Sequence, residues 1–384
     1  MSKNAKTKKV GLVTCFLNNY GACLQAYALE NVIDGLGYNC FIINYYPPEG
    51  YIKPSYGIKK LIMQCFSIMP SLFVPKRYKD YYCSGRYEFD RQFDRFRNKY
   101  LRFDSKHIHD EKSILQNPSK MDTYVCGSDQ IWNPTFYGGN NKIYLLKFVP
   151  DGKKRIAYAP SIGINKIPEQ YEKDFINLIN RYSTISVRED AGAKIVKELT
   201  GRDCRVVLDP TLLISRSNWI KLIKPPKITK PYIFLYLFGT RDFIGEFIEH
   251  IKNIADIPIV AIPFTEREKA NDFKKLYSAG PLDFVSLIAN ASLVITDSFH
   301  ATAFSINLNI PFYALLRDEE NNPEGMNSRI HSILHLTGLN NRLIFNKSNF
   351  PKDLNSDMDF SDSNNRLNKK RKEDIDFLRE ALKE

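Results

Sequence analysis

Long apolar runs are absent from this sequence: no segment of its 384 residues approaches the ~20 consecutive apolar residues that a membrane-spanning helix needs. A lysine-rich N-terminus followed by "VGLVTCFL" imitates a signal peptide, but the apolar run is short and no small-residue cleavage site follows it. Cysteine is scarce as well, because the chain has seven, an odd number without paired spacing, which indicates reduced thiols. We therefore expect a cytoplasmic protein.

Signatures of several functional classes are also missing. The chain has no zinc-finger, basic-zipper or RNP-type motif and its basic residues are scattered, so nucleic acid is not an expected partner. No His and Cys residues cluster at metal-ligand spacing, so we expect no metal site. The balance is nevertheless basic, with 55 Lys+Arg against 43 Asp+Glu, which indicates anionic partners such as phosphorylated small molecules or a membrane surface.

Short apolar segments that alternate with helical patterns predict an α/β fold built on parallel sheets. In the first half of the chain the predicted strands are residues 9–16, 40–45, 123–129, 155–161, 184–189 and 205–210. In the second half they are residues 232–239, 257–264, 292–298 and 311–316. Because ligands bind beyond the carboxyl ends of parallel strands, we expect the site at those ends.

A proline-rich linker divides this pattern in two. Residues 221–232 hold three prolines among lysines, which is typical of a connection between domains. We therefore predict two Rossmann-like domains, residues 1–222 and 223–384, with the active site in the cleft between them. The second domain is expected to end in a charged helix.

Residues 51–120 interrupt the alternation of the first domain. One interpretation is an inserted pair of helices, of which residues 86–103 are the charged second member. The alternative is that residues 56–82 lie on the inner leaflet of the plasma membrane, where basic side chains meet anionic headgroups. The basic residues of this alternative are Lys59, Lys60, Lys76 and Arg77.

Polar residues follow the predicted strand that ends in "CGSDQIWNP". Gly127 and Ser128 are explained equally well by a structural turn. The combination of Asp129, Gln130 and Trp132 is explained less well by a turn, because it places two polar groups beside a flat apolar surface on which a sugar ring could stack. This strand end is therefore a candidate sugar site.

Two further strand ends carry candidate residues. After the first strand, Asn18 and Asn19 are candidate helix caps, and Gly21 lets the backbone approach another group closely. A single glycine is weak evidence for phosphate binding, since the dinucleotide fingerprint needs three. The strand "TISVRED" ends in Arg188 and Glu189, which form either a surface ion pair or an anion-binding site facing the cleft.

A histidine stands where the helix after "SLVITDS" begins. Ser298 is the expected cap of this helix, and first-turn amides lack intrahelical partners, so they favour an anion. His300 would add a switchable proton donor beside a bound phosphate. Downstream, Arg317 follows the next strand, and Asn327 and Arg329 start a further helix, so that both arginines could reach the same crevice.

Several segments of the sequence, taken together, indicate a family. They are "NNYGACLQAYAL", "VCGSDQIWNP", "AYAPSIG", "ISVRED", "LDPTLLIS", "VITDSFHATAFSI" with "IPFYAL", and "NSRIHSILHLTGLNNR". In this order and spacing, from about residue 10 to residue 342, they resemble the polysaccharide pyruvyl transferase family. The resemblance implies a fold similar to the glycosyltransferase B architecture, with the acceptor on the N-terminal domain and phosphoenolpyruvate on the C-terminal domain.

The resemblance also implies a reaction. Phosphoenolpyruvate supplies a pyruvyl group to two hydroxyls of one sugar, galactose being the acceptor suggested by the family, and forms a cyclic ketal in a lipid-linked precursor of capsule or exopolysaccharide. Phosphoenolpyruvate is a substrate, and no cofactor is expected. Family relatives often carry glycine after the histidine, whereas this chain has Ala301, which narrows the space at the helix start.

The resemblance assigns roles to two residues, and the strand-end residues described above complete the expected site. His300 and Arg188 become candidates for phosphoenolpyruvate contacts, with His300 either the general acid or the group that stabilises the departing phosphate. Asp129 or Glu189 would be the base, and the choice stays open. The expected substrate-binding residues are Arg188, Ser298, Phe299, Arg317, Asn327, Arg329, Asn19, Tyr20, Gly21, Ser128, Gln130 and Trp132. Two alternatives remain: a nucleotide-sugar glycosyltransferase on the same fold, and a non-catalytic phosphosugar-binding protein.

Overall fold

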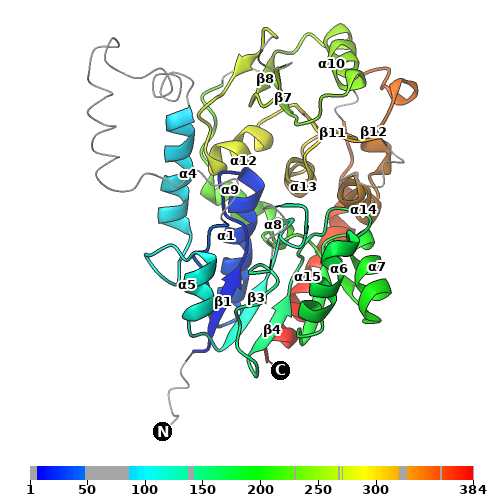
Figure 1. Cartoon of the computed structure of the whole chain (residues 1–384). Helices are drawn as coiled ribbons and strands as arrows, with labels where there is room; N and C mark the ends of the chain where they lie inside the picture. Colours follow the sequence, from blue (N-terminus) through cyan, green and yellow to red (C-terminus); the bar gives the residue numbers. More distant parts are fainter. Residues whose placement is uncertain are drawn as a thin grey trace, which may run out of the picture.

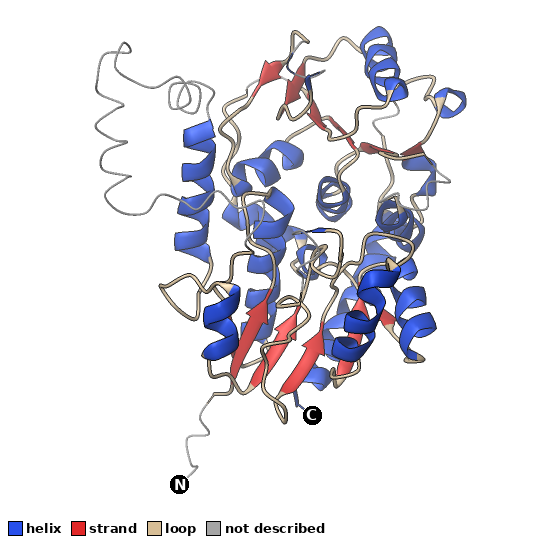
Figure 2. Ribbon diagram, in the orientation of Figure 1, coloured by secondary structure: helices blue, strands red, loops and turns tan. Residues whose placement is uncertain are grey.

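The computed structural model describes residues 7–47, 86–136, 142–228, 231–266, 269, 271–319, 327–354 and 357–383. These residues form two α/β domains, each built around one sheet and stacked one above the other in Figure 1. Figure 2 shows the strands of each sheet flanked by helices. All pairings between the named strands are parallel.

The sheet of the N-terminal domain has the order β2-β1-β3-β4-β5-β6. Its strands are β1 (Lys9–Val13), β2 (Asn39–Ile42), β3 (Thr123–Cys126), β4 (Lys154–Ala157), β5 (Thr184–Val187) and β6 (Arg205–Val206). The chain runs outward to β2 on one side of β1 and to β3 on the other. A topological switch point therefore lies between β1 and β3.

The sheet of the C-terminal domain has the order β12-β11-β10-β7-β8-β9. Its strands are β7 (Ile233–Tyr236), β8 (Ile259–Ala261), β9 (Lys274–Lys275), β10 (Leu293–Thr296), β11 (Phe312–Leu315) and β12 (Leu343–Ile344). Here the chain changes direction between β7 and β10, so the second switch point lies between those two strands.

All ten predicted strands are present, and the predicted pair of Rossmann-like domains, the architecture of the glycosyltransferase B fold, is confirmed. Among the described residues, the strands that sequence patterns missed are β9 and β12. Like β6, each of them is an edge strand of two residues.

Helices connect successive strands and cover the sheets. In the N-terminal half they are α1 (Tyr20–Gly35), α4 (Arg86–Tyr100), α5 (Glu111–Gln116), α6 (Glu169–Ile179), α7 (Asp190–Thr200), α8 (Pro210–Leu213) and α9 (Arg216–Leu222). In the C-terminal half they are α10 (Asp242–Ile254), α12 (Pro281–Ala289), α13 (Phe299–Leu308), α14 (Ser328–Thr337) and α15 (Ser361–Lys383), with short 3-10 helices at Asn340–Arg342 and Lys347–Asn349.

The predicted insertion is described only in part. The charged helix expected over residues 86–103 is present as α4. Residues 56–82, on which the membrane-surface alternative depends, lie outside the described residues. Among the helices that are described, none combines the length and the apolar character needed to cross a bilayer.

An apolar core joins the two domains near the start of α1. The ring of Tyr20 stacks on Phe284 of α12 with centroids 4.8 Å apart, and its hydroxyl donates to the carbonyl of Ala279 at 2.9 Å. Trp219 of α9 packs against Phe304 of α13 with centroids 5.0 Å apart. One continuous buried cluster therefore spans both domains and holds their strand ends opposite each other.

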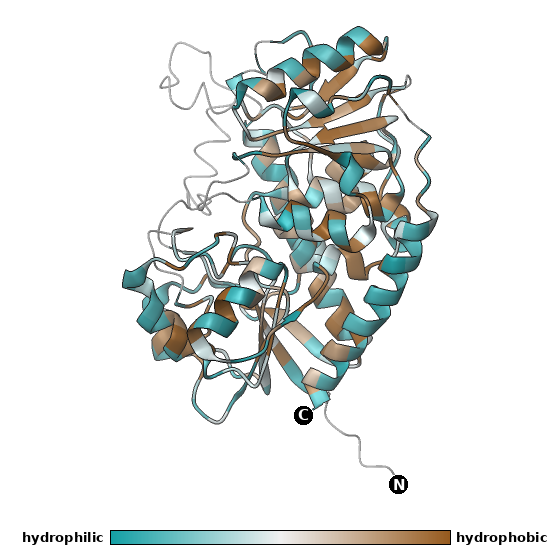
Figure 3. Cartoon of the chain, turned by 90° about the vertical axis from the view of Figure 1, so that its right-hand side faces the viewer, coloured by the Kyte–Doolittle hydropathy of each residue, from teal (hydrophilic) through white to brown (hydrophobic). Residues whose placement is uncertain are grey.

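The C-terminal helix α15 returns to the first domain. The buried carboxylate of Asp374 accepts from the backbone N–H of Leu208 at 2.8 Å, and Lys370 donates to the carbonyl of Val206 at 2.7 Å. In Figure 3 the ribbon of this helix, which ends at the C-terminus, is coloured largely as hydrophilic. The predicted charged helix thus packs against the β6 edge of the N-terminal sheet. Apart from Asp374 and Lys370, most of its charged residues are exposed to solvent.

Candidate functional site

A cavity of about 270 Å³ lies between the domains, at the carboxyl ends of both sheets. The N-terminal domain lines it with Cys15, Leu17, Asn19, Ala22, Asp129, Gln130 and Phe136. The C-terminal domain lines it with Phe238, Ser298, Phe299, His300, Arg317 and Arg329. These residues follow β1 and β3 in one sheet, and β7, β10 and β11 in the other, so the cavity adjoins both switch points.

Two helices begin at this cavity. The side chain of Asn19 accepts from the N–H of Ala22 at 3.1 Å and caps α1, and Ser298 caps α13 by accepting from Ala301 at 3.5 Å. Both caps agree with the predicted ones. Because the first-turn amides carry partial positive charge, the two helix starts together favour an anion in the cavity.

Gly21 lies directly against the ring of His300. A Cβ atom on Gly21 would stand 2.0 Å from Nδ1 of His300, a distance that no real contact reaches. The close approach predicted at Gly21 therefore exists, and the group that approaches is the imidazole from the other domain.

His300 and Asp209 form a buried pair across the domain boundary. Nε2 of His300 lies 3.5 Å from Oδ2 of Asp209, that oxygen accepts from Arg188 at 2.9 Å, and Oγ of Ser128 lies 3.1 Å from it. Burial raises the pKa of Asp209, but the charges of His300 and Arg188 outweigh burial and hold this pKa far below its ordinary value. Asp209 is therefore ionised at neutral pH and can orient His300.

Sequence reasoning did not identify Asp209. The residue stands at the end of a predicted strand and precedes Pro210, so its position alone resembles that of the other candidates. Its side chain also caps α8 by accepting from the N–H of Thr211 at 2.9 Å. The sequence feature that could have identified Asp209 is an acidic residue at a strand end, but helix capping explains such a residue equally well.

Arg188 lies behind the cavity instead of on its wall. Its guanidinium donates to Asp209, lies 3.5 Å from Oδ1 of Asp129, and stacks 4.4 Å above the ring of Phe299. Burial lowers the pKa of Arg188, but the charges of Asp209 and Asp129 outweigh it and raise this pKa. The predicted alternative, a surface ion pair between Arg188 and Glu189, is wrong. Both side chains are buried, and the carboxylates that pair with Arg188 come from the ends of other strands.

Arg317 and Arg329 are the arginines that line the cavity. Arg317 makes a 3.4 Å ion pair with Asp297 and stacks 4.8 Å from the ring centroid of Phe238. The Nε atoms of both arginines are buried, and neither has a hydrogen-bond partner among the described residues. Planar guanidinium groups with free donors are suited to phosphate and carboxylate.

Arg329 is the least compensated of these charges. It is 8% exposed, and within the described parts of the chain it forms no ion pair. Burial, together with the nearby charges of Arg188 and Arg317, outweighs the opposing charges of Glu189 and Asp129 and lowers the pKa of Arg329 to about 10. An anion in the cavity would supply the counter-charge that this buried arginine lacks.

Two predicted substrate contacts are structural. Trp132 is fully buried and donates to the sulfur of Cys126 at 3.1 Å, so the expectation that it stacks on a sugar is wrong. Its ring packs edge-on against Phe175 and Tyr182. Tyr20 is also buried and joins the domains, as described above. Both aromatic side chains are stabilised by burial of their large apolar surface in the core, so they are not exposed to a ligand in the cleft.

Glu189 supports a loop and does not reach the cavity wall. One carboxylate oxygen accepts from the hydroxyl of Ser161 at 3.0 Å and from the N–H groups of Ile162 and Gly163 at 2.9 and 3.1 Å. The side chain is fully buried. Asp129 lines the cavity instead, after a sharp turn in which its φ is 71°.

Two more predicted contacts also lie off the cavity wall. The side chain of Asn327 donates to the carbonyl of Asp318 at 2.9 Å and so connects the start of α14 to the segment that follows β11. The hydroxyl of Ser128 donates to the carbonyl of Ala159 at 2.7 Å and is fully buried. Both side chains therefore shape the surroundings of the site.

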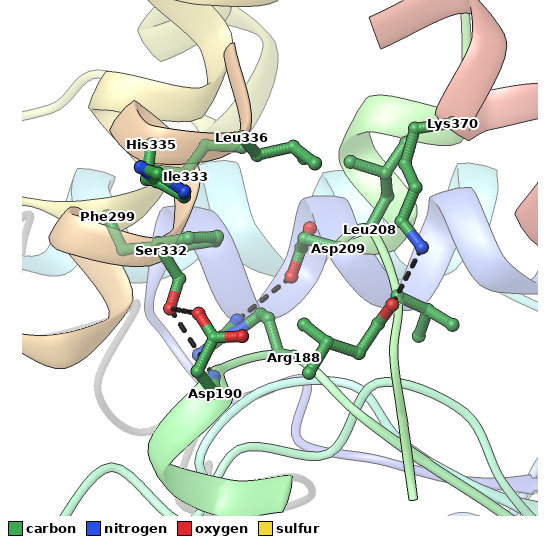
Figure 4. A pocket seen from close by; sticks show the side chains of 12 residues that line it. Arg188, Asp190, Leu208, Asp209, Phe299, Ser332, Ile333, His335, Leu336 and Lys370 are labelled. Atoms are coloured by element: carbon green, nitrogen blue, oxygen red, sulfur yellow. Dashed lines mark hydrogen bonds and ion pairs between the residues drawn. The ribbon is translucent and has the colours of Figure 1, made fainter. Parts of the chain in front are cut away.

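A second cavity of about 210 Å³ lies on the other side of Arg188 and Asp209 (Figure 4). Phe299 lines both cavities. The hydroxyl of Ser332 on α14 donates to the carboxylate of Asp190 on α7 at 2.6 Å and joins the domains at its rim. Within the described residues, no group of three or more His, Cys, Asp or Glu side chains could hold a metal ion.

Solved structures with a similar fold include two sugar-nucleotide enzymes. The UDP-GlcNAc 2-epimerase of Methanocaldococcus jannaschii is 14% identical, with a TM-score of 0.48 over 98% of this chain and 99% of that one. A heptosyltransferase of E. coli is 11% identical, with a TM-score of 0.40 over 91% of this chain and 96% of that one. A comparison with curated proteins finds no significant match.

The family comparison is more specific. The model of the polysaccharide pyruvyl transferase family matches residues 19–319, which include the start of α1, the ends of every named strand except β1 and β12, and the His300 helix. This match covers most of the chain and most of the cavity wall. The chain therefore belongs to the polysaccharide pyruvyl transferase family.

Proposed function

We propose that this protein transfers the pyruvyl group of phosphoenolpyruvate to two hydroxyls of one sugar in a lipid-linked saccharide, a precursor of capsule or exopolysaccharide, and releases phosphate. The observation that carries the proposal is a buried cation, Arg329, that forms no ion pair among the described residues and lines the same interdomain cavity as the paired His300. Phosphoenolpyruvate presents a phosphate and a carboxylate close together, and this cavity offers several convergent donors for them.

The donor fits the wall of the C-terminal domain. Arg317 and Arg329 offer unpartnered N–H groups, and the first turn of α13 adds backbone donors. His300 stands in that same turn, so it is adjacent to any anion held there. Arg188 acts from behind, where it keeps Asp209 and Asp129 in place. We assign Arg188 this positioning role in place of the substrate contact that the resemblance implied.

The chemistry requires a proton donor near the methylene carbon of phosphoenolpyruvate. His300 delivers a proton to that carbon, the double-bond electrons form the new C–H bond, and the adjacent carbon becomes electrophilic. A sugar hydroxyl adds there and gives its proton to a carboxylate base, from which a proton returns to His300 before the next turnover. The bond to the phosphate oxygen then breaks, and phosphate leaves with the bonding electrons. The second hydroxyl closes the ketal ring, and its proton goes to phosphate.

Asp129 is the better candidate for the base. It lines the cavity, whereas one oxygen of Glu189 is taken up by three loop donors. Arg188 holds one oxygen of Asp129 at 3.5 Å, which orients the carboxylate. The geometry thus favours one of the two acids that the sequence left open.

Phosphoenolpyruvate is expected to protect the protein against heat, because a ligand that binds only the folded state raises the melting temperature. A concentration a hundredfold above Kd would stabilise the fold by about 2.7 kcal/mol. Thermal melts with phosphoenolpyruvate and with a panel of nucleotide sugars would measure this effect. Protection by a nucleotide sugar alone would favour the glycosyltransferase alternative, and phosphate release with a mass gain on a glycoside would exclude a non-catalytic binder.

Changing Gly21 to alanine is expected to lower kcat about a hundredfold, because the new methyl group must displace the ring of His300 and a 1 Å misplacement can cost that much. Gly35→Ala is the matched control, since a Cβ at Gly35, in the same helix, meets nothing within 4 Å. Steady-state kinetics of ketal formation would test both variants. Equal activity of the two would show that the contact with His300 does not matter.

A further inference from the structure

The wall of the interdomain cavity is divided by charge. Every lysine, arginine or histidine that lines the cavity among the described residues comes from the C-terminal domain. The N-terminal wall contributes Asn19, Asp129 and Gln130 beside the aromatic ring of Phe136. Among the described residues, the counter-charges for the anionic donor therefore lie on one wall, and the opposite wall has groups suited to a substrate of different chemistry.

A carboxylate, two carboxamides and an aromatic ring are the groups that recognise a sugar. Carboxylate and amide side chains bond to neighbouring hydroxyls, and an aromatic ring covers the apolar C–H face of a pyranose. We propose that the acceptor pyranose stacks on Phe136, with its reacting hydroxyl pair at Asp129. This inference rests on the proposed function and adds a specificity-determining residue, Phe136, that the sequence patterns did not single out.

The local structure holds Phe136 at the cavity. Buried Trp132 anchors the segment after β3 in the core. Asn133 then builds a tight turn, in which its side chain accepts from the N–H of Thr135 at 3.0 Å and its carbonyl accepts from Phe136 at 3.4 Å. The tryptophan expected to meet the sugar thus serves as the anchor, and the aromatic residue four positions later lines the cavity.

Gln130 is held in a similar way. Gly163 has a φ of +69°, and a Cβ at this position would stand 2.1 Å from Nε2 of Gln130. The absence of a side chain at Gly163 therefore makes room for the carboxamide beside Phe136. The positions of Phe136 and Gln130 on the N-terminal wall are therefore fixed by the turn at Asn133 and by the space that Gly163 leaves.

The test compares the two substrates. In Phe136→Ala the KM for a synthetic hexopyranoside acceptor should rise about tenfold or more, as expected when an aromatic anchor is truncated, while the KM for phosphoenolpyruvate should change less than about threefold. Phe136→Trp should keep the acceptor KM near the wild-type value. Tyr277→Ala is the matched control, because Tyr277 is an exposed aromatic residue that does not line the cavity.

A direct titration separates this inference from the proposed function. Calorimetric binding of a panel of hexopyranosides, galactosides included, is measured on the wild-type protein and on Phe136→Ala without any donor. Binding weakened about tenfold in the variant supports the stacking role even if no ketal forms, in which case only the proposed reaction fails. Unchanged binding or acceptor KM, equal changes in both KM values, or no sugar binding by the wild-type protein would each overturn the inference.

Discussion

Replacing His300 by alanine is expected to lower kcat by about a thousandfold while the protein stays folded, since a positioned general acid typically contributes two to four orders of magnitude. The imidazole lines the cavity, and the ionised carboxylate of Asp209 orients it from the other domain. The fold tolerates the loss because Arg188 and Thr211 still bind that carboxylate.

The control for this experiment is His107→Ala, because His107 is exposed and remote from the cavity. Kinetics of phosphate release and thermal melts are measured on both variants. Near-normal turnover in His300→Ala would remove the residue from the mechanism. A variant that unfolds would show instead that the pair with Asp209 mainly holds the domains together.

Replacing Arg329 by methionine is expected to stabilise the free protein and to abolish its protection by phosphoenolpyruvate. The folded state lowers the pKa of Arg329 to about 10, below that of the unfolded chain, so the folded state binds this proton more weakly. The charge therefore costs stability at every pH below about 10, on the order of 3 kcal/mol, and the cost disappears only as the pH rises above that value. Methionine fills similar space without a charge.

Denaturant unfolding at neutral pH, with and without phosphoenolpyruvate, measures both effects. Arg216→Met is the matched control, because Arg216 is exposed at the start of α9 and should change neither quantity. A less stable Arg329→Met would mean that the guanidinium has a counter-charge that favours the fold. Retained protection by the ligand would place the donor elsewhere in the molecule.

Part of the candidate site could be predicted because it depends on local interactions. The caps Asn19 and Ser298 bind N–H groups three residues away, and the position of His300 in a first turn follows from its cap. The close approach at Gly21 was also expected, although the chain pattern did not identify its partner. Helix starts and strand periods are set by neighbours along the chain, so sequence spacing is enough to find them.

The pair of His300 with Asp209 could not be predicted, because its partners lie in different domains and meet only when α13 packs beside α8. The same holds for Arg188, whose partners are fixed by which strands are adjacent in the sheet. Trp132 and Phe136 illustrate the limit most directly. Both are aromatic residues after one strand, and only the tertiary packing decides that the first is buried and the second faces the cavity.

The sequence by itself determined ten strands, the helix caps and the family to which the chain belongs, because these depend on short-range periodicity and on residue order. Only the tertiary structure decided which strand-end residues meet. Burial and ion pairing are long-range effects, since a side chain gains or loses solvent according to elements far away in the chain. For that reason Arg329, and not Arg188, is the arginine that lines the cavity without an ion pair among the described residues.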